Sequence, residues 1–133
     1  MPLKRLYERL LLHPSDLKSS RDDFEVVGVF NPGAVRVGDE VTLLVRVAEQ
    51  PREHKEGYTG LPRWNNHGEL AIDWVDNQEL EPVDPRVVRR KADGLVRLTF
   101  TSHLRVVRCG DGRSVQEITD ARFLPGCELE EFG

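Results

Sequence analysis

The 133-residue sequence lacks the features that mark membrane and secreted proteins. None of its apolar runs approaches the length of about 18 residues that spans a bilayer as a helix. The N-terminus, MPLKRLYERLLL, is interrupted by charges and therefore lacks the apolar block of a secretory signal. These absences favour a cytoplasmic protein without a membrane partner.

Cysteine and histidine are also scarce. The two cysteines, Cys109 and Cys127, cannot form a zinc site by themselves and lie too far apart in sequence for a redox pair. The four histidines show neither HExxH nor HxH spacing. The sequence therefore predicts no metal site, no cofactor and two reduced thiols; a disulfide is the less expected alternative without a secretory signal.

Positive charge is not in excess, since 19 Lys and Arg residues face 23 Asp and Glu residues and leave a net charge of −4. A general nucleic-acid-binding protein normally carries a basic excess. The basic run at residues 86–91 alternates its charges between the two faces of a predicted strand, which is typical of a solvated hairpin. We therefore expect no nucleic-acid partner, and a small nucleic-acid-binding barrel is the weakest alternative.

Short segments rich in Val, Leu, Ile and aromatic residues recur along the chain, and Gly, Asn, Asp and Pro separate them. The expected strands are residues 24–30, 34–37, 41–48, 69–76, 86–90, 95–101 and 102–108. Short Gly-containing loops around Gly38 and Gly94 indicate hairpins. The pattern predicts one all-β domain over residues 1–133, arranged as a meander in a sandwich, a barrel or propeller blades.

Three other segments complete this prediction. Residues 3–12 have leucines at helical spacing and form a short helix or a loop, which Pro14 ends. Residues 49–66 contain two prolines and two glycines and are expected to be a long irregular connection of the kind that is often functional. Residues 77–85 are expected to be another loop.

The most informative stretch is residues 29–49, VFNPGAVRVGDEVTLLVRVAE. Arg46 stands in an apolar strand, where its guanidinium must reach water or meet a partner because an unpaired buried charge is very costly. Asn31 before Pro32, taken alone, is an ordinary turn residue.

This stretch resembles the opening of glycoside hydrolase family 130, the β-mannoside phosphorylases and mannosidases. Three further segments resemble family motifs in the same order: HPSDL at 13–17, SHLRVVRCGDG at 102–112 and LPGCELEEFG at 124–133. The resemblance implies the N-terminal one and a half to two blades of a five-bladed β-propeller. It also implies a fragment or truncated form, because the family's Gly-Val-Glu-Asp-Pro-Arg signature would begin where the sequence ends.

The resemblance further implies which residues act. Asn31 and Arg46 match the family positions that hydrogen-bond the mannosyl unit of the substrate. The catalytic general acid, an Asp, is expected just after Gly133, so whether this chain alone is an enzyme stays open. The family reaction inverts the anomeric centre, with inorganic phosphate as co-substrate in the phosphorylases and water in the hydrolases.

Other candidates are weighed against simpler roles. Asp84 lies in VDPR at 83–86, which mimics the missing signature, but a turn acceptor before Pro85 is the simpler interpretation. Tyr58 and Trp64 lie in the expected long loop, where exposed rings would stack on a sugar. Trp74, in an alternating strand, is expected in the core.

A non-catalytic β domain that binds carbohydrate or serves in assembly is the alternative function. An incomplete propeller leaves apolar faces open, so we expect self-association or pairing with the remainder of the propeller. The residues expected on these faces are Val27, Val29, Leu43, Val45, Leu98 and Phe100.

Overall fold

The protein was analysed as a computed structural model, which describes residues 1–132. Its strands are β1 Phe24–Val37, β2 Glu40–Pro51, β3 Tyr58–Trp64, β4 Leu70–Asp76, β5 Leu80–Asp84, β6 Val87–Arg90, β7 Val96–Leu98, β8 Thr101–Cys109 and β9 Glu117–Phe123. The only helices within this range are short 3₁₀ turns: η1 Pro14–Asp16, η2 Asn77–Glu79 and η3 Glu128–Glu130. The prediction of an all-β fold is confirmed. No helix in residues 1–132 is long and apolar enough to cross a membrane.

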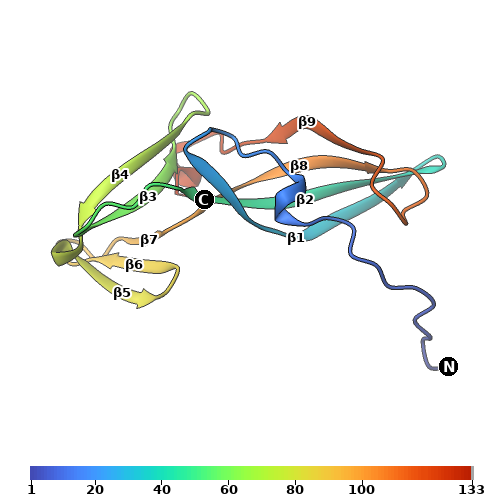
Figure 1. Cartoon of the computed structure of the whole chain (residues 1–133), viewed down its shortest axis with the longest axis horizontal. Coiled ribbons are helices and arrows are strands. Elements are labelled where there is room, and N and C mark those ends of the chain that lie inside the picture. The colour runs from blue at the N-terminus through green and yellow to red at the C-terminus, as the bar shows by residue number, and fades with distance from the viewer. Residues whose placement is uncertain (133) are drawn as a thin grey trace.

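The strands form three antiparallel sheets, with the orders β1-β2-β8-β9, β3-β4 and β5-β6-β7. The first sheet makes the long body of the molecule, and the two smaller sheets lie together at one end of it (Figure 1). After these sheets the chain returns, and β8 pairs with β2. The predicted meander is therefore wrong, because turn residues specify local hairpins but not the partner of a strand that pairs far along the chain.

Two predicted loops contain strands. β2 runs on to Pro51 and β3 lies inside residues 49–66, while β5 lies inside residues 77–85. The prolines in these segments suggested loops, but both β3 and β5 are edge strands. An edge strand tolerates proline because one side of its backbone needs no sheet partner. The strand β9 was not predicted.

The predicted N-terminal helix is also absent, and residues 1–12 run as an irregular segment that leaves the sheet (Figure 1). Leu3 and Leu6 are fully or almost fully exposed, so nothing within residues 1–132 covers the apolar side that a helix would present. A helix of about ten residues is marginal in water without such packing. Of the two predicted forms, helix or loop, the structure has the loop.

The main core lies on one face of the β2–β8 pair. Leu43, Val45 and Val107 are buried there, and Leu11 and Leu12 of the N-terminal segment pack against them. The expectation that Leu43 and Val45 lie on an open face is therefore wrong, because the chain preceding β1 folds back over that face.

The opposite face of the same sheet is the less covered one. Its residues Leu44, Leu104 and Val106 are half-buried. Phe30 of β1 and Phe123 of β9, which pair with the same face, are 36% and 62% exposed. Of the residues expected on open faces, Leu43 and Val45 are buried, whereas Val27 is 43% exposed and Val29, Leu98 and Phe100 are half-buried.

A buried polar cluster ties the loop before β1 to the sheet. Glu49 is completely buried, and its carboxylate accepts hydrogen bonds from the backbone N–H and the hydroxyl of Ser20. His103 Nδ1 lies 3.3 Å from Glu49 Oε2 across the β2–β8 pair. Burial acts to raise the pKa of Glu49, but the contacts with His103 and Ser20 outweigh it, so the pKa lies below its usual value.

We expect Glu49→Gln to lower the free energy of unfolding at pH 7 by about 1–3 kcal/mol, because a charged hydrogen-bond acceptor is lost in the core. A carboxyl group with a depressed folded-state pKa stabilises the fold above its unfolded pKa and loses that contribution as the pH falls through the folded value. As the pH falls below about 4.5, the free energy of unfolding should therefore decrease less for the variant than for the wild type. Denaturant unfolding across this pH range, with the exposed Glu56→Gln as a control, measures both effects. Identical pH profiles for wild type and Glu49→Gln would contradict the assignment.

Candidate functional site

Asn31 lies at a β-bulge in the middle of β1. Phe30 pairs with Arg46 and Gly33 with Leu44, so β1 carries one more residue than β2 between these pairs. Asn31 has a φ of 48°, in the left-handed region that Asn tolerates better than most residues. Pro32 fits beside it because a bulge leaves a ladder hydrogen bond unmade. The bulge holds Asn31 exposed on the sheet, and its side chain makes no hydrogen bond within residues 1–132.

Arg46 lies across from this bulge on β2, half-buried on the less covered face of the sheet. Its Nε donates a hydrogen bond of 3.1 Å to Ser102 Oγ on β8, and its guanidinium carbon lies 5.3 Å from the centre of the Phe30 ring. The guanidinium is thus held by one hydrogen bond and one aromatic face. Its two Nη groups have no hydrogen-bond partner in the described part of the chain and stay available to a ligand.

A hollow of about 430 Å³ opens beside Arg46. Its lining residues are Arg46, Ser102, His103, Leu104, Phe123, Leu124, Pro125 and Glu130. Asn31 is not among them; it follows Phe30, the strand partner of Arg46, in the bulge of β1. A guanidinium and a hydroxyl beside an apolar wall can bind the hydroxyls of a polar ligand and cover its C–H surface.

The two aromatic candidates of the expected loop have different surroundings. Trp64 is only 3% exposed and packs with Phe24 and Leu70 in a second core cluster, so its predicted exposure is wrong. It is buried because the expected loop contains strand β3, whose last residue is Trp64. Tyr58, at the first residue of β3, is 49% exposed, as expected. The structure brings neither ring to the hollow beside Arg46.

Asp84 ends β5 and is exposed. Its Oδ1 accepts a hydrogen bond of 2.7 Å from the backbone N–H of Arg86. This is the turn-acceptor geometry that the sequence suggested as its simpler role. Asp84 lies on a different sheet from Asn31 and Arg46, and the position after Gly133, where the resemblance puts the general acid, is outside the described residues.

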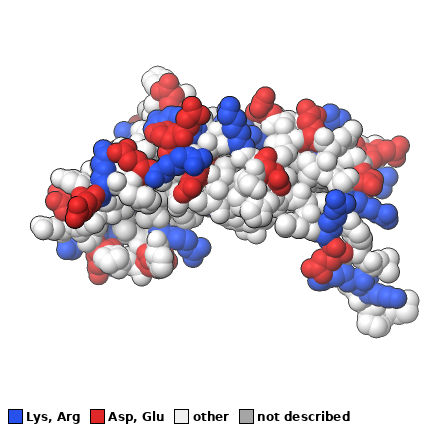
Figure 2. All heavy atoms as spheres, viewed as in Figure 1, with Lys and Arg blue, Asp and Glu red and all other residues white. Residues whose placement is uncertain are grey.

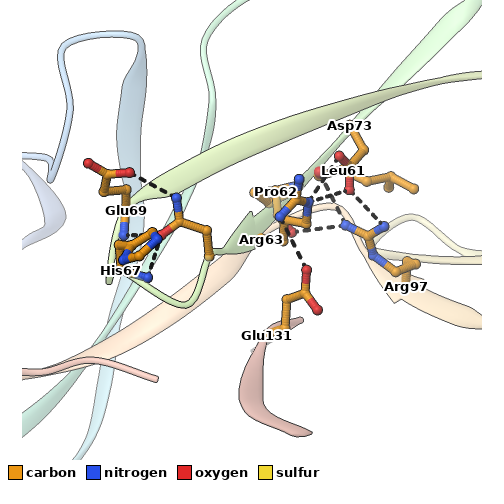
Figure 3. A network of polar contacts seen from close by, with 9 residues as sticks. Leu61, Pro62, Arg63, His67, Glu69, Asp73, Arg97 and Glu131 are labelled. Atoms are coloured by element: carbon orange, nitrogen blue, oxygen red, sulfur yellow. Dashed lines mark hydrogen bonds and ion pairs between the residues drawn. The ribbon is translucent and has the colours of Figure 1, made fainter. Parts of the chain in front are cut away.

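The last described residues are fastened to the smaller sheets by a polar network (Figure 3). Arg63 of β3 lies between two carboxylates, with Nε 3.0 Å from Asp73 Oδ2 and Nη1 3.2 Å from Glu131 Oε1. Arg97 of β7 contacts Asp73 at 3.2 Å and lies 4.1 Å from the centre of the Phe132 ring. The backbone N–H of Trp64 also donates to the carbonyl of Glu131. These contacts determine where the segment that follows β9 runs.

Charge compensation in this network differs between its two arginines. Hydrogen bonding to Asp73 raises the pKa of Arg63. Burial lowers the pKa of Arg97, and Asp73 acts in the opposite direction. Arg97 is 7% exposed and also donates to the carbonyls of Leu61 and Pro62, so its charge is buried but not unpaired.

The basic run at residues 86–91 is a hairpin whose charges are compensated locally. Arg89 pairs with Glu81 at 3.4 Å, and Arg90 pairs with Asp93. The contact with Arg90 lowers the pKa of Asp93 to about 2. Acidic and basic side chains also alternate over the face of the molecule in Figure 2. This distribution agrees with a solvated hairpin.

No group of three metal-binding side chains is present among residues 1–132. Cys109 is buried and Cys127 exposed, and both are free thiols. Burial, followed by the nearby Asp111, raises the pKa of Cys109. A buried thiol with a raised pKa is unreactive at neutral pH.

Sequence reasoning missed one residue of this site and misjudged the surroundings of another residue. Ser102 was assigned to a motif without a role, although it is the hydrogen-bond partner of Arg46. Trp74, expected in the core, is half-buried and lines a surface hollow with Tyr58. The pairing of β2 with β8 was the signal needed for Ser102, and it is not local in sequence.

Comparison with known proteins identifies relatives of the chain. It is 33% identical over 138 residues to a β-1,2-mannobiose phosphorylase of Listeria innocua serovar 6a, a match that covers 100% of the chain. The solved structure of β-1,2-mannobiose phosphorylase from Listeria innocua in complex with β-1,2-mannobiose superposes with a TM-score of 0.77, at 34% identity over 90% of the chain. The chain is homologous to this phosphorylase.

The all-β fold of the chain matches the sheet-rich fold of that enzyme. The chain spans 39% of the length of the curated relative and 35% of the chain in the solved structure. No protein-family model matches the chain. The similarity supports a carbohydrate-active protein, in agreement with the function that the sequence predicted.

We expect Asn31→Gly to leave stability nearly unchanged and Asn31→Val to cost about 1–2 kcal/mol, because a β-branched residue is strained at positive φ. Both variants remove the amide, so both should weaken binding of a ligand that Asn31 contacts. Thermal unfolding separates the two variants in stability, and calorimetric titration compares them in binding. Equal melting temperatures for both would contradict a backbone requirement at the bulge.

Proposed function

We propose that the chain is the N-terminal portion of a glycoside hydrolase family 130 enzyme that acts on β-mannosides. The observation that carries the proposal is the pair Asn31 and Arg46. The Ser102 hydrogen bond holds the guanidinium of Arg46 beside an open hollow, and the bulge in β1 places the amide of Asn31 directly after Phe30, the strand partner of Arg46. The homologous phosphorylase was solved with β-1,2-mannobiose, which makes a β-linked mannoside the first ligand to test.

In this proposal Arg46 and Asn31 bind the mannosyl unit whose anomeric carbon reacts. Two free Nη groups can donate together to vicinal hydroxyls, and the amide can donate to one hydroxyl and accept from another. Fixing these hydroxyls orients the C1–O bond of the glycoside for attack from the opposite side. Arg46 is suited to this task because Phe30 and Ser102 already restrict its side chain.

The reaction proposed for the complete enzyme inverts the anomeric centre. An oxygen of inorganic phosphate forms a bond to C1 while the C1–O bond to the leaving sugar breaks, and an Asp gives its proton to the leaving oxygen through the 3-hydroxyl of the mannosyl unit. In the hydrolytic alternative water replaces phosphate. That Asp is proposed to follow Gly133, and phosphate is the only co-substrate proposed.

We also propose that the chain forms the first one and a half to two blades of a five-bladed propeller in the cytoplasm. The half-exposed face with Phe30, Leu44 and Phe123 supports this, because a blade buries both faces against its neighbours. In this proposal the half-exposed face packs against the remainder of the propeller or against a second copy of the chain. A non-catalytic carbohydrate-binding domain is the alternative function, distinguished by binding without turnover.

Arg46→Ala should weaken binding of β-1,2-mannobiose by about 10- to 100-fold, since a hydrogen bond to a charged group contributes about 1.5–3 kcal/mol. Arg90→Ala is the matched control, because Arg90 is a half-exposed arginine paired only with Asp93 in a hairpin. Calorimetric titration and circular dichroism measure binding and folding together. Equal losses for the two variants, with both folded, would argue against the assignment of Arg46.

Asp84→Asn should leave any phosphorolysis of β-1,2-mannobiose unchanged within about twofold, because the carboxylate serves a turn and loss of a general acid costs about 10²–10⁴ in rate. Release of mannose 1-phosphate is the measurement. A loss of that size would instead make Asp84 the general acid.

A further inference from the structure

Trp74 of β4 lies across the backbone of β3. It pairs with Gly60, and a Cβ atom at Gly60 would lie 3.0 Å from Cζ3 and 3.1 Å from Cη2 of the indole. These distances are closer than ordinary contacts, so the ring occupies the space that any other residue at position 60 would need. The Trp74 ring therefore packs directly on the backbone of Gly60, which restricts the position of the ring.

The Trp74 indole carries the ammonium of Lys55 over its ring. Lys55 Nζ lies 4.3 Å from the centre of the indole, over its face. The Lys55 side chain is 43% exposed, and its other partner is the exposed Glu53 at 3.9 Å. An ammonium rests on this face because the face of an aromatic ring is electronegative. The C–H face of a pyranose is electropositive and meets the same requirement.

The surroundings of the ring suit a sugar. Trp74 lines a hollow of about 270 Å³ together with Tyr58, His54, Gln50 and Glu53. Donors and acceptors thus surround an aromatic surface, which is the arrangement that binds hydroxyl groups at the rim of a stacked ring. Tyr58 adds a second, 49% exposed aromatic side chain.

The rim of this hollow is ordered by a tight turn. The backbone N–H of Tyr58 donates to the carbonyl of Lys55 at 3.0 Å, and Gly57 between them has a φ of 79°. A turn whose third residue has a positive φ favours glycine at that position, because glycine adopts this conformation without steric strain. The carbonyl of Gly57 also accepts from the backbone N–H of Asn77. The backbone at Lys55 and Tyr58 is therefore fixed on either side of the turn, so little backbone order must be gained on binding.

We propose that the Trp74 hollow binds one pyranose unit of an oligosaccharide, as a site separate from Asn31 and Arg46. No residue lines both hollows. The sugar stacks on the indole after Lys55 moves aside, and the polar side chains at the rim bind its hydroxyls. That the sugar is a mannoside rests on the function proposed above.

The experiment measures binding of β-1,2-manno-oligosaccharides by calorimetry in an Arg46→Ala background, in which binding at the first site is weakened. Trp74→Ala should weaken the remaining binding at least about 10-fold. Lys55→Ala should tighten it about 2- to 5-fold, because the competing ammonium contact contributes about 0.5–1 kcal/mol at an exposed position. Lys18→Ala is the matched control, at an exposed lysine that lies over no aromatic ring within residues 1–132.

Each outcome decides the proposal. Binding that survives Arg46→Ala, is lost with Trp74→Ala and tightens with Lys55→Ala supports it. Binding that Arg46→Ala abolishes overturns the second site while the first stands, and absence of binding by the wild type overturns both. Weaker binding by Lys55→Ala also overturns the proposed stacking on Trp74, since Lys55 would then be a ligand contact. Lys55 lies in an exposed turn, so Lys55→Ala still tests the proposal where Trp74→Ala fails to fold.

Discussion

The pairing of β2 with β8 is the interaction on which the rest of the structure depends. It joins segments on either side of both smaller sheets, and Arg46 meets Ser102 across 56 residues of sequence. The same pairing brings His103 to the buried Glu49 and aligns Leu43 with Val107 in the core. One strand pair thus provides the core on one face and the candidate site on the other, because side chains alternate between the faces of a sheet.

The site combines local backbone geometry with distant side chains. The bulge at Asn31 is local, since an Asn-Pro-Gly sequence accommodates a left-handed residue and a missing ladder hydrogen bond. The restraint of Arg46 is distant, since it needs Ser102 from β8. The Arg63–Asp73–Arg97 network in turn fastens the segment after β9 to β3 and β7. The first two features position the candidate ligand-binding residues. The third determines the course of the chain after β9.

The two tryptophans show where sequence reasoning fails in this protein. Trp64 was expected at the surface and is buried, whereas Trp74 was expected in the core and is half-buried. Proline and glycine in residues 49–66 suggested a loop, but an edge strand accepts Pro62, and Gly60 makes room for the ring of Trp74. Alternation along β4 correctly grouped Leu70, Ile72 and Trp74 on one face. It could not show that only Leu70 is buried, while Ile72 packs at the border of the core and Trp74 lines a surface hollow.

The sequence by itself determined the all-β class and the hairpins around Gly38 and Gly94, and it pointed to Asn31 and Arg46 as candidate ligand-binding residues. These rest on short-range signals: β-branched runs, glycine turns and a motif within residues 29–49. Only the tertiary structure decided that β8 pairs with β2, which face the N-terminal segment covers and which tryptophan is accessible. These outcomes depend on contacts between segments far apart in the chain, for which local propensity carries no information because packing energy is shared among many distant side chains.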